Sequence, residues 1–212
     1  MRWNVLFLLT LTFACRPDPG PANYPSDSGL DGIPPTADPD FYSGETAYTG
    51  DVPRLFLSLF YEGAYSSEIP VDDYTRFYYI WDDTFSQTNS DDRVEGYFSD
   101  KIVVGDLGWW GGGLSYNSGE DLSEWVGLHL AIKSTDVASA GIIVGSNSGE
   151  YEVSLGDYGY APDGQWHYIS IPTSAFVGID WTQVVMPWSL TGTGANGDEV
   201  LVDDVYYFGE SQ

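Results

Sequence analysis

Short apolar runs separated by turn-forming residues fill the chain from about residue 55 onward. None shows the 3.6-residue period of a long amphipathic helix, whereas several alternate apolar and polar positions as strands do. The pattern predicts strands at 55–61, 77–81, 94–98, 102–104, 108–116, 125–133, 141–144, 151–155, 166–171, 184–190 and 200–208. Many short strands joined by turns predict an all-β fold, an antiparallel two-sheet β-sandwich or jelly roll.

Alternation within the strands predicts which side chains face the core. In 125–133 the even-numbered positions are apolar, so His129 is expected to point away from the core of its sheet. In 166–171 the apolar phase is Ile169 and Ile171, which puts Trp166 on the opposite face. His167 shares the phase of Ile169, and we expect a hydrogen-bonded histidine at the start of a strand.

Residues 108–113 read GWWGGG, two indoles beside three residues without side chains. Leu114 has the parity of Trp110, so Trp110 is expected in the core and Trp109 on the outer face. Tyr158 and Tyr160 fall in a loop between strands and are also expected off the core. Flat aromatic faces off the core suit sugar rings, which present C–H groups to them.

Residues 1–14 have the composition of a secretory signal peptide: Arg2 precedes an apolar run, 5–11, that is too short to span a bilayer. The only cysteine, Cys15, follows directly, as in the cleavage box of bacterial lipoproteins, where that cysteine is acylated. We therefore expect a lipid anchor on Cys15 at the bacterial outer membrane or cell surface, with simple secretion as the alternative. A single cysteine allows no intrachain disulfide.

Residues 15–53 hold eight of the twelve prolines and few apolar side chains. Such a segment buries too little surface to offset its ordering entropy, so we predict a disordered, proline-rich tether. The predicted organisation is a signal peptide at 1–14, a tether at 15–53 and a β-sandwich domain at 54–212.

Acidic side chains outnumber basic ones 32 to 7, which gives a formal net charge of −25. Phosphate backbones and anionic lipid surfaces would be repelled, which argues against nucleic acid as a partner. Carboxylate oxygens instead suit divalent cations such as calcium. Asp203 and Asp204 interrupt the apolar strand VLVDDVYYF, where a charge is costly unless it is paired or binds a cation.

The sequence contains no catalytic motif. The string nearest to a serine-hydrolase elbow, GSNSG at 145–149, has Asn147 in place of the serine, and no GxxxxGK nucleotide loop is present. His129 and His167 are the only histidines, too few for a histidine-rich zinc site. A small glycosidase or lyase would require two facing carboxylates in a deep cleft.

Several strings, in this order and spacing, resemble a known family: DRVEGYFSD, GWWGGGLSY, DLSEWVGLHLAIKS, YGYAPDGQWHYISIPTSAF and VLVDDVYYF. Over about residues 55–208 the chain is similar to the galactose-binding-like jelly-roll modules appended to bacterial polysaccharide hydrolases, and in particular to carbohydrate-binding modules of the family 11 type. The resemblance implies a sandwich that binds glycan chains without cleaving them. It also implies a structural calcium ion near the first and last strands.

Carried over by position, the resemblance implies calcium ligands at Glu62 and Asp203. It implies sugar contacts from residues on a sheet face or loop edge, here Trp109, His129, Tyr158, Tyr160 and Trp166. The expected function is non-catalytic binding of a polysaccharide or oligosaccharide at the cell surface. A structural or adhesion lipoprotein that holds a protein partner is the alternative, and it predicts one contiguous apolar patch of outward aromatics.

Overall fold

The computed structural model describes residues 54–56, 76–94 and 98–209. Within these residues the chain forms eleven strands and three short 3-10 helices. The strands are β1 (Arg54–Phe56), β2 (Arg76–Ile80), β3 (Phe85–Ser90), β4 (Ser99–Val104), β5 (Trp109–Tyr116), β6 (Gly127–Lys133), β7 (Ser139–Ser146), β8 (Gly149–Ser154), β9 (His167–Pro172), β10 (Val184–Thr193) and β11 (Glu199–Phe208). The helices are η2 (Trp81–Asp83), η3 (Leu155–Tyr158) and η4 (Thr173–Ala175).

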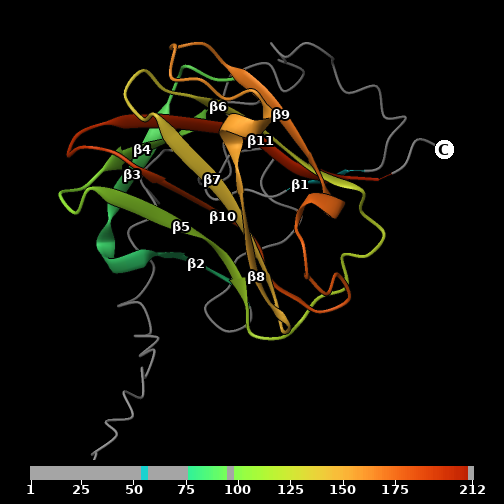
Figure 1. Ribbon diagram of the computed structural model, residues 1–212. Coiled ribbons are helices and arrows are strands. Elements are labelled where there is room, and N and C mark those ends of the chain that lie inside the picture. Colours follow the sequence, from blue (N-terminus) through green and yellow to red (C-terminus); the bar gives the residue numbers. More distant parts are fainter. Residues whose placement is uncertain (1–53, 57–75, 95–97, 210–212) are drawn as a thin grey trace, which may run out of the picture.

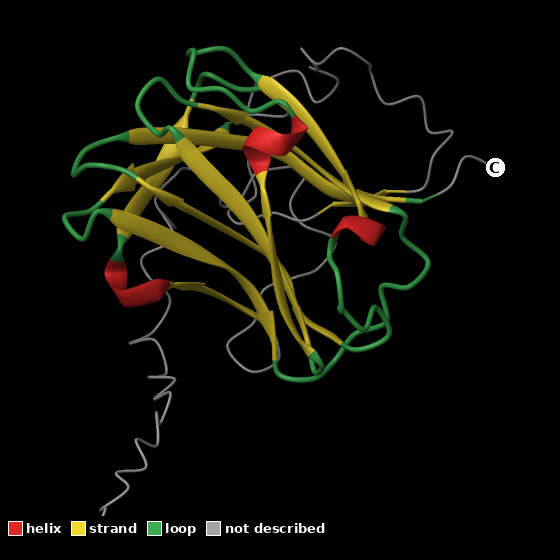
Figure 2. Ribbon diagram, in the orientation of Figure 1, coloured by secondary structure: helices red, strands yellow, loops and turns green. Residues whose placement is uncertain are grey.

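Two antiparallel sheets pack face to face (Figures 1 and 2). One, the β11 sheet, has the order β3-β4-β11-β6-β9, with β1 also paired to β11. The other, the β10 sheet, has the order β2-β5-β10-β7-β8. The chain crosses between sheets repeatedly; β10 and β11, consecutive in sequence, are the central strands of opposite sheets. This confirms the predicted all-β antiparallel sandwich of the jelly-roll type.

The core lies between the sheets and follows the predicted alternation. Leu128, Leu130 and Ile132 of β6 are fully buried, and Trp110 and Trp188 face them from the β10 sheet. Each such side chain stabilises the fold by roughly 2 kcal/mol through removal of apolar surface from water. The inward position of Trp110 is confirmed.

The polar strand β3, of sequence FSQTNS, was not predicted from the pattern. It lies at the edge of the β11 sheet and pairs only with β4, in the register Phe85↔Val104 to Ser90↔Ser99. Phe85 is its one fully buried apolar residue, so the strand carries almost no hydrophobic signal. The predicted strand 94–98 is wrong at Val94 and Phe98, which precede β4 without strand structure; 95–97 lie outside the described residues.

The predicted strand 55–61 is described only over β1, and the remainder lies outside the described residues. The predicted signal peptide and the whole predicted tether, residues 1–53, also lie outside the described residues. Helices of the described part are three or four residues long, and none has the length and hydrophobicity that crossing a membrane requires.

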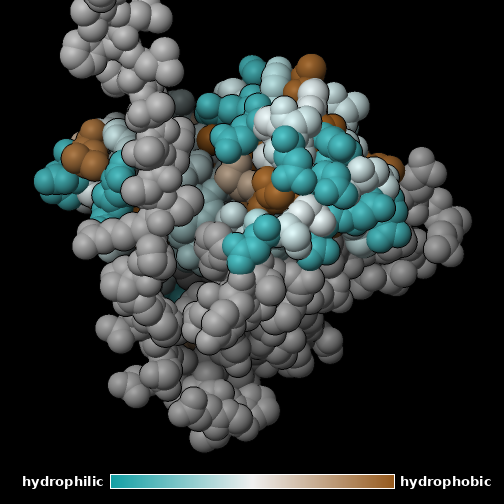
Figure 3. Space-filling model, turned by 90° about the horizontal axis from the view of Figure 1, so that it is seen from below, coloured by the Kyte–Doolittle hydropathy of each residue, from teal (hydrophilic) through white to brown (hydrophobic). Residues whose placement is uncertain are grey.

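The described surface is largely polar. Among the described residues visible from below (Figure 3), hydrophilic ones predominate and hydrophobic ones are scattered between them. Only three large hydrophobic side chains of the described residues are exposed: Leu107, Tyr151 and Val177, which lie on separate elements. The contiguous apolar patch that a protein-binding adhesion module would present is therefore not found in this part of the chain.

Candidate functional site

Glycines form much of the outer face of the β10 sheet. Gly111 and Gly113 of β5, with Gly141 and Gly145 of β7, occupy positions that alternate with core residues and so point away from the core. A methyl group at Gly111 would lie 2.3 Å from Cε3 of Trp81. The indole of Trp81 therefore lies directly against the backbone of β5, and the glycines make room for side chains that lie across the sheet.

Trp81 follows β2, and the local backbone fixes its position. Asp82 and Asp83, directly after it, have φ of 47° and 52°, a left-handed conformation that costs a non-glycine residue roughly 1 kcal/mol. The next residue, Thr84, is fully buried, and its Oγ1 accepts a hydrogen bond from the Gly111 amide at 3.1 Å. The sharp corner thus ties the end of β2 to β5 and holds the indole over the sheet.

Tyr79 lies beside Trp81 on the same face, with ring centroids 5.4 Å apart and planes tilted by 54°. The Tyr79 hydroxyl donates to the Met186 sulfur at 2.7 Å, and its oxygen also lies 2.7 Å from the Ser189 hydroxyl oxygen. The pKa of Tyr79 is raised well above its usual value, chiefly by burial and further by the charge of Glu150. The hydrogen bond with Ser189 lowers it only in part. The phenol is therefore neutral and held in place over β10.

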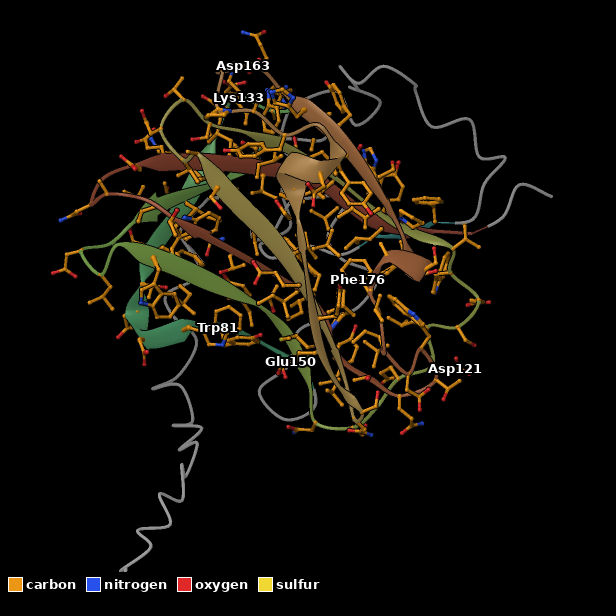
Figure 4. The ribbon with its side chains drawn as sticks, in the orientation of Figure 1. Trp81, Asp121, Lys133, Glu150, Asp163 and Phe176 are labelled. Carbon is orange, nitrogen blue, oxygen red and sulfur yellow. The ribbon has the colours of Figure 1, made fainter. Side chains whose placement is uncertain are left out.

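Two glutamates of the edge strand β8 lie over the same face. Glu150 pairs with Gly145 and Glu152 with Ile143, and both are exposed. A methyl group at Gly141 would lie 2.6 Å from Glu152 Oε1, so this carboxylate extends over the sheet. Trp81 and Glu150, labelled in Figure 4, come from opposite ends of the strand order. Trp81 lies over β5, and Glu150 is close enough to Tyr79 for its charge to raise the pKa of that phenol.

We call this surface the β10 face and define it by Tyr79, Trp81, Trp109, Glu150, Glu152 and Thr191. Trp109 begins β5 opposite Thr193 and is half-buried, outside the core cluster. Its predicted outward position is confirmed. Thr191 lies opposite Gly111, and its hydroxyl donates to the Trp110 carbonyl oxygen at 3.2 Å. Aromatic planes beside carboxylates are the combination that sugar rings and their hydroxyls require.

Trp166 directly precedes β9 of the β11 sheet, so the core separates it from Trp109. It is half-buried and outside the core cluster, as predicted. Its indole N–H donates to Asp92 Oδ1 at 3.0 Å, and Lys133 Nζ donates to Asp92 Oδ2 at 2.6 Å. Lys133 also lies 5.9 Å from the indole centroid. These contacts attach the loop that precedes β4 to the sheet.

His129 points away from the core as predicted, yet it is buried. Its Nδ1 lies 2.9 Å from the Ser170 hydroxyl, and its ring stacks on Tyr206 at 4.7 Å between centroids. The Asp204 carboxylate lies 3.8 Å from its Nε2. Asp204 has φ of 50° at an irregularity in β11. The predicted sugar contact at His129 thus lies in a packed polar cluster with 8% of its surface exposed.

The two loop tyrosines lie against the core. Tyr160 is buried, and its hydroxyl donates to the Val137 carbonyl oxygen; its predicted position off the core is wrong. Tyr158 ends η3, is half-buried and packs on the core cluster, so it is only partly off the core. The short helix turns both rings inward. His167 is hydrogen-bonded as predicted, with Nε2 2.9 Å from Asp163 Oδ1.

Of the predicted calcium ligands, Glu62 lies outside the described residues. Asp203 is buried in β11, where Oδ2 accepts from the Val94 amide at 2.6 Å and Oδ1 from the Asp204 amide at 2.8 Å. Burial raises the pKa of Asp100 well above its usual range, and the charge of Asp203 raises it further. Oxygen donors under mutual repulsion fit a hard cation. The described residues alone contain no group of three acidic, histidine or cysteine side chains placed to hold one.

The structure therefore divides the predicted sugar contacts between two opposite sheets and the core. Trp81, Tyr79 and the two glutamates of β8 were not predicted from the sequence as site residues. In RFYYIW both phases carry apolar residues, so alternation alone does not tell which side chains face outward. The available signal was the run of glycines at 111–113, because residues without side chains leave room for large side chains above the strand.

The two exposed carboxylates of the β10 face are arranged for contact with a ligand. Because Glu150 and Glu152 come from one strand, they lie about 7 Å apart on one side of the face. Glycoside hydrolysis requires two carboxyl groups that flank the bond from opposite sides. The arrangement suits hydrogen bonding along a ligand that lies flat.

Comparison with solved structures identifies the fold. No protein-family model matches the sequence, and no curated protein matches it either. A family 30 carbohydrate-binding module is similar at a TM-score of 0.52 and 16% identity, covering 67% of this chain and 95% of that one. The family 11 module of Clostridium thermocellum, solved with a β-1,3-1,4-mixed-linked tetrasaccharide, is similar at a TM-score of 0.49 and 18% identity, covering 65% and 91%. The chain has the galactose-binding-like jelly-roll fold of carbohydrate-binding modules.

Proposed function

We propose that this protein binds a glycan on the β10 face without cleaving it. The observation that carries the proposal is the Tyr79–Trp81 pair, held over a glycine-lined sheet and flanked by the exposed carboxylates of Glu150 and Glu152. Sugar rings would stack on the aromatic faces while their hydroxyls donate to the carboxylates. The fold supports the proposal, because it is one that carbohydrate-binding modules share.

A few stacking contacts on an open face give modest affinity, with Kd on the order of micromolar to millimolar. Affinity electrophoresis of the full chain against β-glucans, xylans, mannans, galactans, chitosan and storage glucans tests the proposal. We expect retardation by at least one polymer, reversed by its soluble oligosaccharide. No retardation by any of them, with a folded sample, would overturn the proposal.

We also propose that an acylated Cys15 anchors the chain and that residues 15–53 hold the domain away from the membrane. The support is sequence alone: a short apolar run directly before the only cysteine, followed by a proline-rich segment. Growth with a labelled fatty acid tests this. The label should appear in the wild-type protein of the membrane fraction and be lost in Cys15→Ser. An unlabelled wild-type protein in the medium would favour simple secretion instead.

A structural calcium ion bound through Asp203 is the third proposal, supported by the neighbouring carboxylates of Asp100 and Asp203. A ligand that binds only the folded state raises the unfolding temperature. We therefore expect a calcium chelator to lower Tm by several degrees, and Asp203→Asn to abolish calorimetric calcium binding. An unchanged Tm in chelator, together with no calcium uptake by the wild type, would contradict it.

A further inference from the structure

The polar side chains of the β10 face show which chemistry a ligand should carry. The hydroxyls of this face are already paired: Tyr79 with Met186 and Ser189, and Thr191 with a backbone carbonyl. The carboxylates of Glu150 and Glu152 are exposed and have no hydrogen-bond or ion-pair partner among the described residues. An ionised carboxylate only accepts hydrogen bonds, so these two groups require donors from the ligand.

Positive charge is absent from the described side chains of this face. The described cationic side chains are Arg93, Lys101 and Lys133, which belong to the β11 sheet or to the loop that precedes β4. Lys101 and Lys133 are paired with Glu199 and Asp92. Figure 4 shows Lys133 at the end of the molecule far from Trp81 and Glu150. Among the described side chains, the negative charge of the β10 face is therefore uncompensated, on a chain of net charge −25.

Aromatic faces add a second attraction for cations. The negative face of an indole or phenol ring attracts an ammonium group placed above it. Trp81 is half-buried: the Cε3 and Cζ3 atoms of its indole lie against Gly111, and part of the ring surface stays exposed for a ligand. A neutral hydroxyl also donates to a carboxylate, but an ammonium group supplies three donors together with a compensating charge.

We infer that the preferred ligand is an amino-sugar polymer with free ammonium groups. This inference rests on the proposed function and specifies its ligand class. Polysaccharides that carry carboxylates or sulfates should be repelled by Glu150 and Glu152, and uncharged ones should bind through stacking alone. Along an extended chain, alternate rings would place their ammonium groups near the β8 carboxylates while other rings stack on Trp81.

Three β-1,4-linked hexasaccharides that differ at C2 test the ligand class: glucosamine, N-acetylglucosamine and glucose oligomers, which carry an ammonium group, an acetamide and a hydroxyl. Calorimetric titration of the full chain at low salt should give a Kd about tenfold lower for the glucosamine oligomer than for the other two. Salt of about 1 M should remove most of the difference, because it screens exposed charges.

Glu150→Gln and Glu152→Gln keep the side-chain shape and should each reduce the glucosamine preference about threefold. Glu124→Gln removes the same charge from an exposed loop position outside the β10 face and should leave the preference unchanged. Equal binding of the three oligomers would overturn this inference while the proposed function stands. An unchanged preference in both β8 variants would also overturn it. Binding of no oligomer and of no polysaccharide in the panel would overturn the proposed function as well.

Discussion

Trp81 holds its place on the β10 face because the residue beneath it has no side chain. A Cβ at Gly111 would meet the indole at 2.3 Å, so Gly111→Ala must displace the ring. We expect this variant to fold and to lose roughly fivefold in glycan affinity, since one displaced stacking contact removes on the order of 1 kcal/mol. Titration of the preferred oligosaccharide checks it. Gly156→Ala, whose Cβ would meet only Ser154 Oγ at 3.5 Å, is the control and should bind normally.

Tyr160 should matter for stability and not for binding. Its hydroxyl donates to the Val137 carbonyl from within the core, so Tyr160→Phe leaves a buried acceptor without this donor. We expect a loss of about 1 kcal/mol in the free energy of unfolding, measured by urea denaturation, with glycan affinity unchanged. A variant of normal stability that binds the glycan poorly would contradict this and show that Tyr160 contributes to the binding site.

The inward or outward position of a side chain was predictable in strands where only one of the two alternating sets of positions is apolar. That condition placed Leu128, Leu130 and Trp110 in the core correctly. It fails for Tyr79 and Trp81, because both phases of their strand are apolar. It also fails for Tyr160, which a four-residue helix turns inward. Burial of His129 on an outward face depends on Tyr206 and Asp204, which are distant in sequence.

The loop between β3 and β4 is attached to the β11 sheet through Asp92. Burial alone would raise the pKa of this carboxyl, but hydrogen bonds from Lys133 and Trp166 outweigh it, and the pKa is lowered. A lowered pKa in the folded state stabilises the protein above the unfolded-state pKa of about 3.9, and this contribution is lost as the pH falls through the lowered value.

Asp92→Asn should therefore reduce the free energy of unfolding by about 1 kcal/mol at pH 7, the modest value expected for a largely exposed ion pair. The difference from the wild type should vanish at acidic pH, once Asp92 is protonated. Urea unfolding across an acid series measures this, with Asp91→Asn as the control for loss of a neighbouring exposed charge. A difference that is constant with pH would show that the carboxylate charge does not hold the loop.

At the scale of the element, the prediction succeeded for strands with a hydrophobic signal and failed for β3. An edge strand buries little on either side, so FSQTNS carries one strong apolar anchor and pairs through its backbone. The sequence also did not predict which strands share a sheet. That arrangement separates Trp109 from Trp166 and His129, although all three were predicted to contact one ligand.

At the scale of the molecule, the two outer faces differ in chemistry. The β11 sheet and the loop that precedes β4 carry the described cations, and the sheet also holds the buried carboxylates of Asp203 and Asp204. Its outward Trp166 and His129 contact neighbouring side chains, Asp92 and Tyr206. The β10 face carries glycines, a tilted aromatic pair and exposed carboxylates that have no partner among the described residues. We therefore assign structural roles to the outer face of the β11 sheet and ligand binding to the β10 face.

Titration of Trp81→Ala and Trp166→Ala with the glycan that retards the wild type most strongly tests this assignment directly. Both substitutions remove a half-buried indole that lies outside the core cluster. We expect Trp81→Ala to lose binding and Trp166→Ala to bind like the wild type. Loss of binding in Trp166→Ala with normal binding in Trp81→Ala would contradict it and place the site on the β11 sheet.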